Sequence, residues 1–209
     1  MASVRKGEVF LRKRGEPLGD HGYVPDATPL ERTESGGYVF YHYTRPEHLE
    51  QIFAPDSGLR ARLPIVDGEI FPDLTGRYLI EGFLDPLPRW IVDSPYFGDL
   101  GLTMMRQAVG DLLLRIEVPA DFPGLYMADL AHAFEVRYFQ LHGSAPLDLG
   151  YNTETGHEAM LAVVHSYIPL ADYRGGYVAP NVKATRIDPG IVIPNEFVSI
   201  CQQQPFSDL

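Results

Sequence analysis

The stretch from Val39 to Leu59 constrains the fold more than any other part of the chain, because three local signals follow one another in it. The aromatic and β-branched run Val39–Tyr43 predicts a strand. The spacing of Thr44 and Glu47 is that of a capping box, which predicts the start of a helix. A proline twelve residues after the strand predicts where that helix ends. The stretch therefore predicts a strand, a polar corner and a short amphipathic helix in direct succession.

The polar corner is the first candidate binding site. His42 and Thr44 lie where the chain turns from strand to helix, so we expect their polar atoms to face a ligand rather than the core. After the helix, Gly58 permits a change of direction, and Leu59 is expected to pack back on the helix.

The rest of the chain predicts an α+β fold, with a split, mostly antiparallel β-sheet and short flanking helices. The predicted strands are Glu8–Leu11, Arg89–Val92, Asp111–Val118, Gly176–Ile187 and Ile191–Ile200, and Glu158–Tyr167 fits a strand or a helix, with its valines favouring a strand. The predicted helices are residues 100–110 and about 127–141. Residues 1–36 are predicted to be an N-terminal extension or arm, and residues 37–209 the main domain.

Composition narrows the classes of function. The formal net charge of −11 argues against broad binding to a phosphate backbone, although Val4–Arg14 holds a local basic cluster. Cys201 is the only cysteine, which excludes a disulfide framework and fits a reducing compartment. No apolar run approaches the roughly 20 residues of a membrane span, and no zinc-protease motif occurs. We therefore expect a cytoplasmic protein with neither a membrane partner nor a metal.

Two segments carry a resemblance to a known family. Residues 41–44 read Tyr-His-Tyr-Thr and are followed by a short helix and Gly-Leu at 58–59, while residues 157–170 pair a Glu-Ala-Met-Leu-Ala-Val run with a hydrophobic-Pro. The pattern resembles ADP-ribosyltransferases of the His-Tyr-Glu group, the diphtheria-toxin and PARP-like branch, and is most similar to the DarT-like DNA ADP-ribosyltransferases. The likeness covers roughly residues 38–62 and 151–178. It implies an enzyme that takes NAD as substrate, breaks the nicotinamide–ribose bond and transfers ADP-ribose.

The resemblance also implies roles for individual residues. His42 would donate to the adenosine-side ribose, and Tyr43 and Thr44 would hold the nicotinamide amide through backbone groups. A carboxylate would stabilise the oxocarbenium-like transition state, as in glycoside hydrolysis. Glu158, at the head of an apolar run, is the candidate for that carboxylate, with Glu196 as a rival. Glu154, in a polar loop, is a weaker rival.

Further candidates surround the same expected cleft. Tyr96, in the loop Ser-Pro-Tyr-Phe-Gly, is the candidate for stacking on nicotinamide. Gly58 and Leu59 are candidates for the cleft lining. Arg60 and Arg62 are candidates for contact with the pyrophosphate, because guanidinium groups pair well with phosphate.

The sequence departs from the DarT-like pattern beside the candidate carboxylate, where Thr155, Gly156 and His157 replace a flanking arginine. The acceptor of ADP-ribose therefore stays open among a protein side chain, a nucleic acid, a small molecule and water. The biological role stays open among a toxin, a resistance enzyme and a defence protein. Three alternatives share the fold: an NAD glycohydrolase, an RNA 2′-phosphotransferase and a non-catalytic binding module. The low basic content counts against the phosphotransferase.

Overall fold

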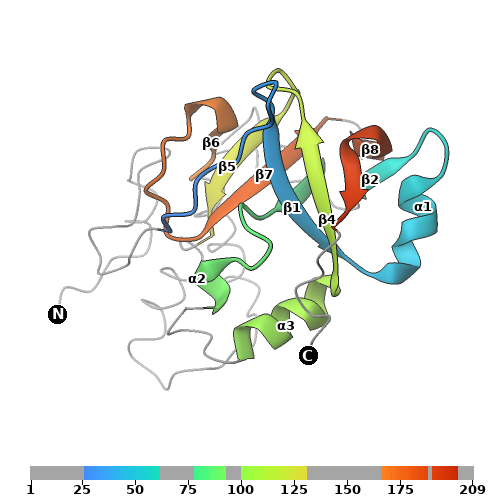
Figure 1. Cartoon of the computed structure of the whole chain (residues 1–209), viewed down its shortest axis with the longest axis horizontal. Coiled ribbons are helices and arrows are strands. Elements are labelled where there is room, and N and C mark those ends of the chain that lie inside the picture. The colour runs from blue at the N-terminus through green and yellow to red at the C-terminus, as the bar shows by residue number, and fades with distance from the viewer. Residues whose placement is uncertain (1–25, 62–77, 93–99, 131–165, 188–189, 202–209) are drawn as a thin grey trace.

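The computed structural model describes residues 26–61, 78–92, 100–130, 166–187 and 190–201, which form an α+β protein of short antiparallel strands with few short helices (Figure 1). Its strands are β1 (Tyr38–Thr44), β2 (Gly58–Ala61), β3 (Tyr78–Gly82), β4 (Leu112–Val118), β5 (Leu125–Asp129), β6 (Ile168–Pro169), β7 (Pro180–Arg186), β8 (Gly190–Pro194) and β9 (Val198–Ile200). Its helices are α1 (Leu49–Phe53), α2 (Arg89–Val92) and α3 (Leu100–Val109), with the 3-10 turns η3 (Pro46–His48), η4 (Leu170–Asp172) and η5 (Asn195–Phe197). No helix in these ranges is long and apolar enough to cross a membrane.

The strands form three antiparallel sheets, in the orders β1-β4-β9, β2-β8 and β3-β7-β5-β6. β1 pairs with β4 along its whole length. Within the described residues, a single isolated bridge joins the β1 sheet to the β3 sheet. In that bridge the N–H of Tyr41 donates to the oxygen of Phe83 at 2.8 Å, and the N–H of Phe83 donates back at 2.7 Å. Among the described residues, backbone pairing between the two sheets is limited to this bridge.

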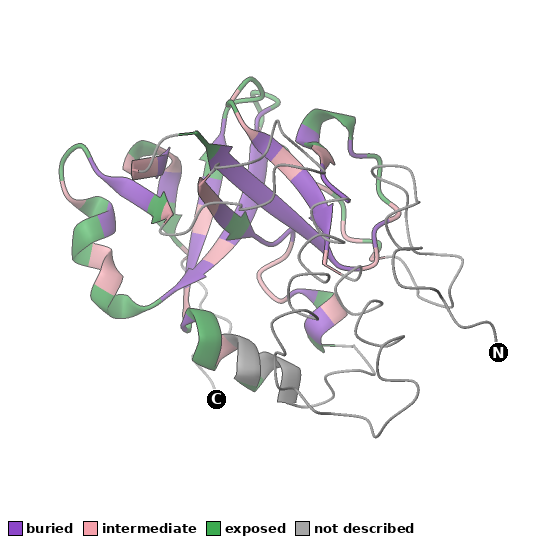
Figure 2. Ribbon diagram, turned by 180° about the vertical axis from the view of Figure 1, so that it is seen from behind, coloured by how far each residue is buried: buried purple, intermediate pink, exposed green. Residues whose placement is uncertain are grey.

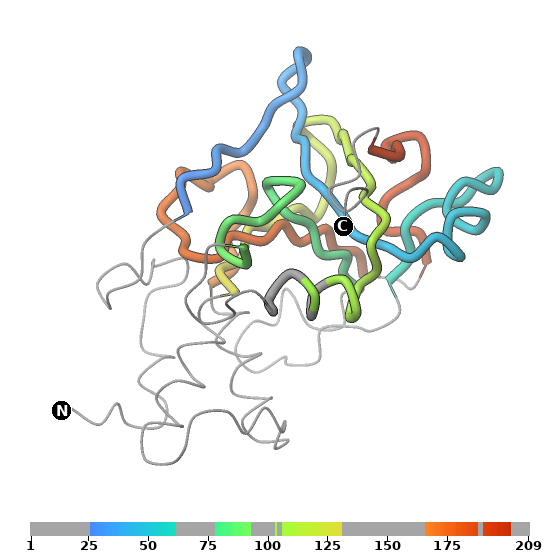
Figure 3. The backbone as a smooth tube through the Cα atoms, turned by 60° about the horizontal axis from the view of Figure 1, so that its bottom comes forward, coloured from blue at the N-terminus to red at the C-terminus, as the bar shows by residue number. Residues whose placement is uncertain are grey.

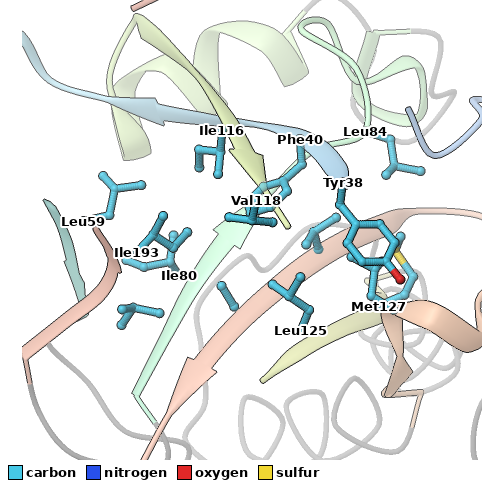
Figure 4. Close-up of a cluster of buried hydrophobic side chains, with 14 of the residues drawn as sticks. Tyr38, Phe40, Leu59, Ile80, Leu84, Ile116, Val118, Leu125, Met127 and Ile193 are labelled. Carbon is cyan, nitrogen blue, oxygen red and sulfur yellow. The ribbon is translucent and has the colours of Figure 1, made fainter. Parts of the chain in front are cut away.

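The main hydrophobic cluster draws side chains from all three sheets (Figure 4). Phe40 of β1 and Ile116 of β4 are fully buried and meet Ile80 of β3, Met127 of β5 and Ile193 of β8. Figure 2 shows the same distribution, with the strands largely buried and α1 largely exposed. Burial of this apolar surface is the main force that holds the sheets together.

A second cluster covers the opposite face of β1. Val39, Tyr41 and Tyr43 alternate with the residues of the main cluster and pack with Phe83 and Leu113. Because successive side chains of a strand point to opposite faces, this alternation buries β1 on both sides. The strand that carries the candidate polar corner is therefore held rigidly.

Residues 26–37 run beside the start of β1 and turn back into it (Figure 3). The oxygen of Glu31 accepts from the N–H of Val39 at 3.1 Å, and its carboxylate accepts from the hydroxyl of Tyr41 at 3.0 Å. The same carboxylate lies 2.8 Å from Arg115 of β4. Burial and this carboxylate together raise the pKa of Tyr41 to about 12. This segment covers the part of that β1 edge near Val39, on the side away from β4.

Several sequence predictions are confirmed. The predicted strands beginning at Val39 and at Asp111 are β1 and β4, and the helix predicted at residues 100–110 is α3. Gly110 follows α3 with φ of +103°, a conformation in which a side chain would be strained and would also meet the backbone oxygen of Thr44.

Other predictions are wrong at particular places. Arg89–Val92 is the helical turn α2 rather than a strand, because the oxygen of Pro88 accepts from the N–H groups of Ile91 and Val92. Met127 is predicted to begin a helix, but it lies in strand β5, which pairs with β7.

The capping box also does not form. No side chain caps either helical turn of the opening motif, and the Thr44 hydroxyl lies 3.2 Å from Nδ1 of His48 instead. The predicted strand Ile191–Ile200 is divided by η5 into β8 and β9, which lie in different sheets. Strand β3 falls in a region where no strand was predicted.

Gly58→Ala is expected to lower the free energy of unfolding by about 1–3 kcal/mol. A Cβ at Gly58 would lie 2.1 Å from the backbone oxygen of Ile193, and backbone in a paired strand cannot yield cheaply. Urea denaturation measures the change. Asp56→Gly is the control in the same turn: Asp56 has φ of +54°, which glycine adopts without strain, so stability is unchanged or rises. A Gly58→Ala protein as stable as wild type would contradict the close packing of β2 on β8.

Candidate functional site

β1 and β3 separate immediately after the bridge between Tyr41 and Phe83. If the two antiparallel strands continued in register, Tyr43 would lie opposite Glu81 and their backbone groups would pair. Instead, Nδ1 of His42 lies 2.8 Å from the backbone oxygen of Glu81. A carbonyl oxygen only accepts hydrogen bonds, so Nδ1 carries a proton and donates it. The imidazole therefore spans the opening between the two strands.

The protonation state of His42 follows from its surroundings. Burial lowers its pKa below the ordinary value of 6.5, against the carbonyl and carboxylate of Glu81, which raise it. A neutral ring with its proton on Nδ1 has a lone pair on Nε2. No other described residue forms a hydrogen bond to this ring, and the side chain keeps part of its surface exposed. Nε2 can therefore accept a hydrogen bond from a hydroxyl group of a ligand, rather than donate one as the resemblance implies.

Tyr43 and Thr44, the next two candidates, use their side chains within the protein. The Tyr43 hydroxyl donates to the backbone oxygen of Pro86, and its ring packs edge-on against Phe83 with 5.9 Å between centroids. Thr44 is buried, with its hydroxyl against His48. Because backbone groups alternate along a strand, those of Tyr43 point to the same edge as those of Tyr41, toward β3. A ligand contact by Tyr43 would thus use its backbone, as the resemblance implies.

Gly58, Leu59 and Arg60 lie together on β2, which pairs with β8. Gly58 is buried against β8 and the side chain of Leu59 belongs to the main core. Arg60 is exposed, and its guanidinium has no ion pair or hydrogen bond with any described residue. Of the three, Arg60 has a side chain that is available to an anionic group.

The remaining candidates fall into two groups. Tyr96, Arg62, Glu154 and Glu158 lie outside the described residues. Glu196 lies in η5, is exposed, and forms no hydrogen bond or ion pair with the described part of the chain. The structure thus brings His42, Tyr43 and Thr44 together on β1 and shows no contact between them and Glu196.

Sequence reasoning missed a charged pair on β3 and β7. Glu81 lies opposite Lys183 in the strand register, and the ammonium contacts Oε1 of the carboxylate. The Lys183 side chain is 1% exposed, whereas that of Glu81 is 52% exposed. Lys183 lowers the pKa of Glu81, outweighing the effect of burial. The sequence offers one signal, the polar residues Asn181, Lys183 and Thr185 at alternate positions. That pattern predicts a strand whose polar side faces solvent, and so it does not reveal a buried lysine.

Asn181 lies on the same face of β7, two residues before Lys183. It is fully buried, and neither its amide nitrogen nor its amide oxygen has a hydrogen-bond partner. Across the sheet, Tyr126 lies opposite Lys183 and Ala128 opposite Asn181. The face of β3 and β7 that points away from the main core therefore carries the polar residues Glu81, Asn181, Lys183 and Thr185, and the amide of Asn181 is unsatisfied.

A hollow of about 210 Å³ lies elsewhere, between β5 and η4. Its walls include the side chains of Tyr38, Phe122, Tyr126 and Leu170, and they do not include His42. The described residues also hold no cluster of histidine, cysteine or acidic side chains arranged as metal ligands.

No protein-family model, curated protein or solved structure matches this chain.

The stability of the protein is expected to fall as pH drops below about 6.5, partly through His42. The folded state lowers the pKa of His42, so the unfolded chain binds its proton more readily. The contribution of the neutral His42 ring to stability is complete above the pKa of the unfolded state, about 6.5. It is lost as the pH falls below that value toward the lower pKa of the folded state. Urea denaturation at pH 7.5 and pH 5.5 measures the loss, which should be smaller in His42→Gln. Equal losses in both proteins would show that His42 does not titrate on unfolding.

Asn181→Leu is expected to raise the free energy of unfolding by about 1–2 kcal/mol, because it removes a buried amide with no partners. Asn195→Leu is the matched control. Its amide donates to the oxygen of Ala54 at 2.8 Å, so the same substitution should lower stability by about 1 kcal/mol. Thermal denaturation compares the two variants with wild type, and a destabilised Asn181→Leu protein would contradict the assignment of an unsatisfied amide.

Proposed function

We propose that this protein is an NAD-dependent mono-ADP-ribosyltransferase whose substrate binds at the opening between β1 and β3. The observation that carries the proposal is the placement of His42. The ring of this motif histidine is fixed by the carbonyl of Glu81, and its Nε2 is directed to no described group of the protein. An imidazole held in one tautomer, with one nitrogen available, is suited to orienting a ribose hydroxyl.

The proposed reaction breaks the bond between C1′ of the nicotinamide ribose and the pyridinium nitrogen. The bonding electrons leave with nicotinamide, which departs as a neutral molecule, and positive charge develops on the ribose. The acceptor then donates a lone pair to C1′ and loses a proton to solvent. Because charge develops on the sugar, a nearby carboxylate stabilises the transition state more than the ground state.

The roles of Tyr43 and Arg60 rest on the sequence motifs and on the positions of these residues, and those of Tyr96 and Glu158 rest on the sequence motifs alone. The backbone of Tyr43 would hold the nicotinamide amide, whereas that of Thr44 points to β4 by the same alternation, and Arg60 would meet the pyrophosphate. Tyr96 would stack on nicotinamide, and Glu158 would stabilise the oxocarbenium ion. Support from the described residues comes from β1, which is buried on both faces and so holds the motif in a fixed geometry.

His42→Ala is expected to lower the rate of NAD cleavage about 100-fold, because it removes the group that orients the ribose. The rate is measured by using chromatography to monitor the release of nicotinamide from NAD. His48→Ala is the control, since His48 belongs to the same motif but bonds the hydroxyl of Thr44. A His42→Ala protein with full activity, or a folded wild-type protein that releases no nicotinamide, would refute the proposal.

The same assay identifies the acceptor. NAD labelled in its adenylate half is incubated with separate pools of protein, DNA and RNA, and the label is followed. Label on a macromolecule supports a transferase, and the labelled pool names the acceptor class. Release of free ADP-ribose alone would instead make water the acceptor and the protein an NAD glycohydrolase. Glu158→Gln should abolish either reaction while leaving the fold intact.

A further inference from the structure

The pair of Glu81 and Lys183 differs from an ordinary cross-strand ion pair. Such pairs usually lie on the exposed face of a sheet, where both side chains are solvated. Here the ammonium is 1% exposed and contacts one carboxylate oxygen, while the carboxylate keeps 52% of its side chain exposed. The ammonium of Lys183 thus lies below the surface, and the carboxylate of Glu81 lies between it and solvent.

Burial of Lys183 is costly, and the pair has no other described partner that would offset the cost. A buried ammonium needs a close anion, and replacing a buried pair with apolar side chains is often neutral or stabilising. Among the described residues, neither Glu81 nor Lys183 forms another hydrogen bond or ion pair through its side chain, so the second carboxylate oxygen has no described partner. The arrangement keeps one ionised oxygen accessible at a fixed place on the sheet.

Glu81 is also the residue that holds His42. Its backbone oxygen accepts from Nδ1 of the imidazole at 2.8 Å, and its carboxylate interacts electrostatically with the same ring. One residue therefore fixes the tautomer of the motif histidine and places a negative charge near it. Both groups, the carboxylate and Nε2 of His42, are hydrogen-bond acceptors.

Asn181 gives an independent indication that this face is built to bind. Its amide is fully buried and has no partner, two residues from Lys183 on the same face of β7. A buried unsatisfied group lowers stability, and such groups concentrate at functional sites. The polar face of β3 and β7 thus contains a buried cation and an unpaired amide, both of which make the fold less stable.

We propose that Glu81 is a specificity-determining residue of the site: its carboxylate contacts the nicotinamide-ribose half of the dinucleotide, and Lys183 is its positioning residue. The inference rests on the proposed function. The positive charge of NAD lies on the nicotinamide ring, and the ribose hydroxyls donate hydrogen bonds. The ionised carboxylate complements the positive ring, and Nε2 of the neutral imidazole complements a ribose hydroxyl. NADH and ADP-ribose keep the ribose hydroxyls but lack the positive ring, so the carboxylate gains little from either.

The test measures binding of NAD, NADH and ADP-ribose by calorimetry to wild type and to Glu81→Gln. We expect Glu81→Gln to weaken NAD binding about 10-fold and to change the affinities for NADH and ADP-ribose less than twofold. Glu117→Gln is the matched control, because Glu117 also lies on a strand, has 48% of its side chain exposed and pairs with Arg115. Equal weakening for all three ligands, or none, would overturn the inference.

Glu81→Gln leaves the buried ammonium without its anion and can fail to fold for that reason. The double variant Glu81→Gln/Lys183→Met removes both charges and should match wild type in stability while binding NAD as weakly as the single variant. Lys183→Met alone should weaken NAD binding by less, since the carboxylate is present but no longer held. A folded double variant that binds NAD as tightly as wild type would overturn the inference.

A second measurement is independent of NAD. The carboxylate of Glu81 raises the pKa of His42, so the pKa of the His42 ring, followed by NMR, should fall in the folded double variant. An unchanged value would show that the carboxylate does not act at the site. If wild type binds none of the three ligands, the proposed function fails and this inference fails with it. If His42→Ala abolishes NAD binding and the Glu81 variants do not affect it, only this inference fails.

Discussion

A single backbone bridge between Tyr41 and Phe83 is the constraint on which the candidate site depends. It fastens the β1 sheet to the β3 sheet, while two hydrophobic clusters on opposite faces of β1 prevent the strand from moving. One residue further along, the strands separate, and the imidazole of His42 occupies the place where a regular sheet would have a backbone hydrogen bond. The candidate site is thus an interruption in strand pairing, stabilised by the packing around it.

Much of the fold could be predicted from local pattern, and the failures have physical causes. β1, β4 and α3 carry strong periodicity and clear end signals, such as Gly110, and their predictions are confirmed. Arg89–Val92 has strand-forming residues but is too short for propensity to outweigh the preceding proline. The segment starting at Met127 matches a helical period, yet pairing with β7 makes it a strand. The first failure is thus a local turn at Pro88, and in the second a tertiary contact overrides a weak local preference.

The candidate site was predictable only in part, because a motif reveals neighbours in sequence and not neighbours in space. His42 was found from its place between a strand and a helix. Glu81 and Lys183 are separated by 102 positions, and nothing local marks either as buried or paired. Asn181 reads as an ordinary polar residue of a half-exposed strand, and its lack of partners appears only when the strand is packed. These residues follow from sheet register, which a single sequence specifies poorly.

The segment that contains Glu31 has a consequence for self-association. It covers the outer edge of β1 near Val39, and the carboxylate of Glu31 forms an ion pair with Arg115 on the neighbouring strand. A chain beginning at Gly37 would leave the N–H of Val39 without this partner. Unpaired backbone groups at a strand edge are a template for strands of other molecules, so residues 26–36 limit the part of β1 that is open to such pairing.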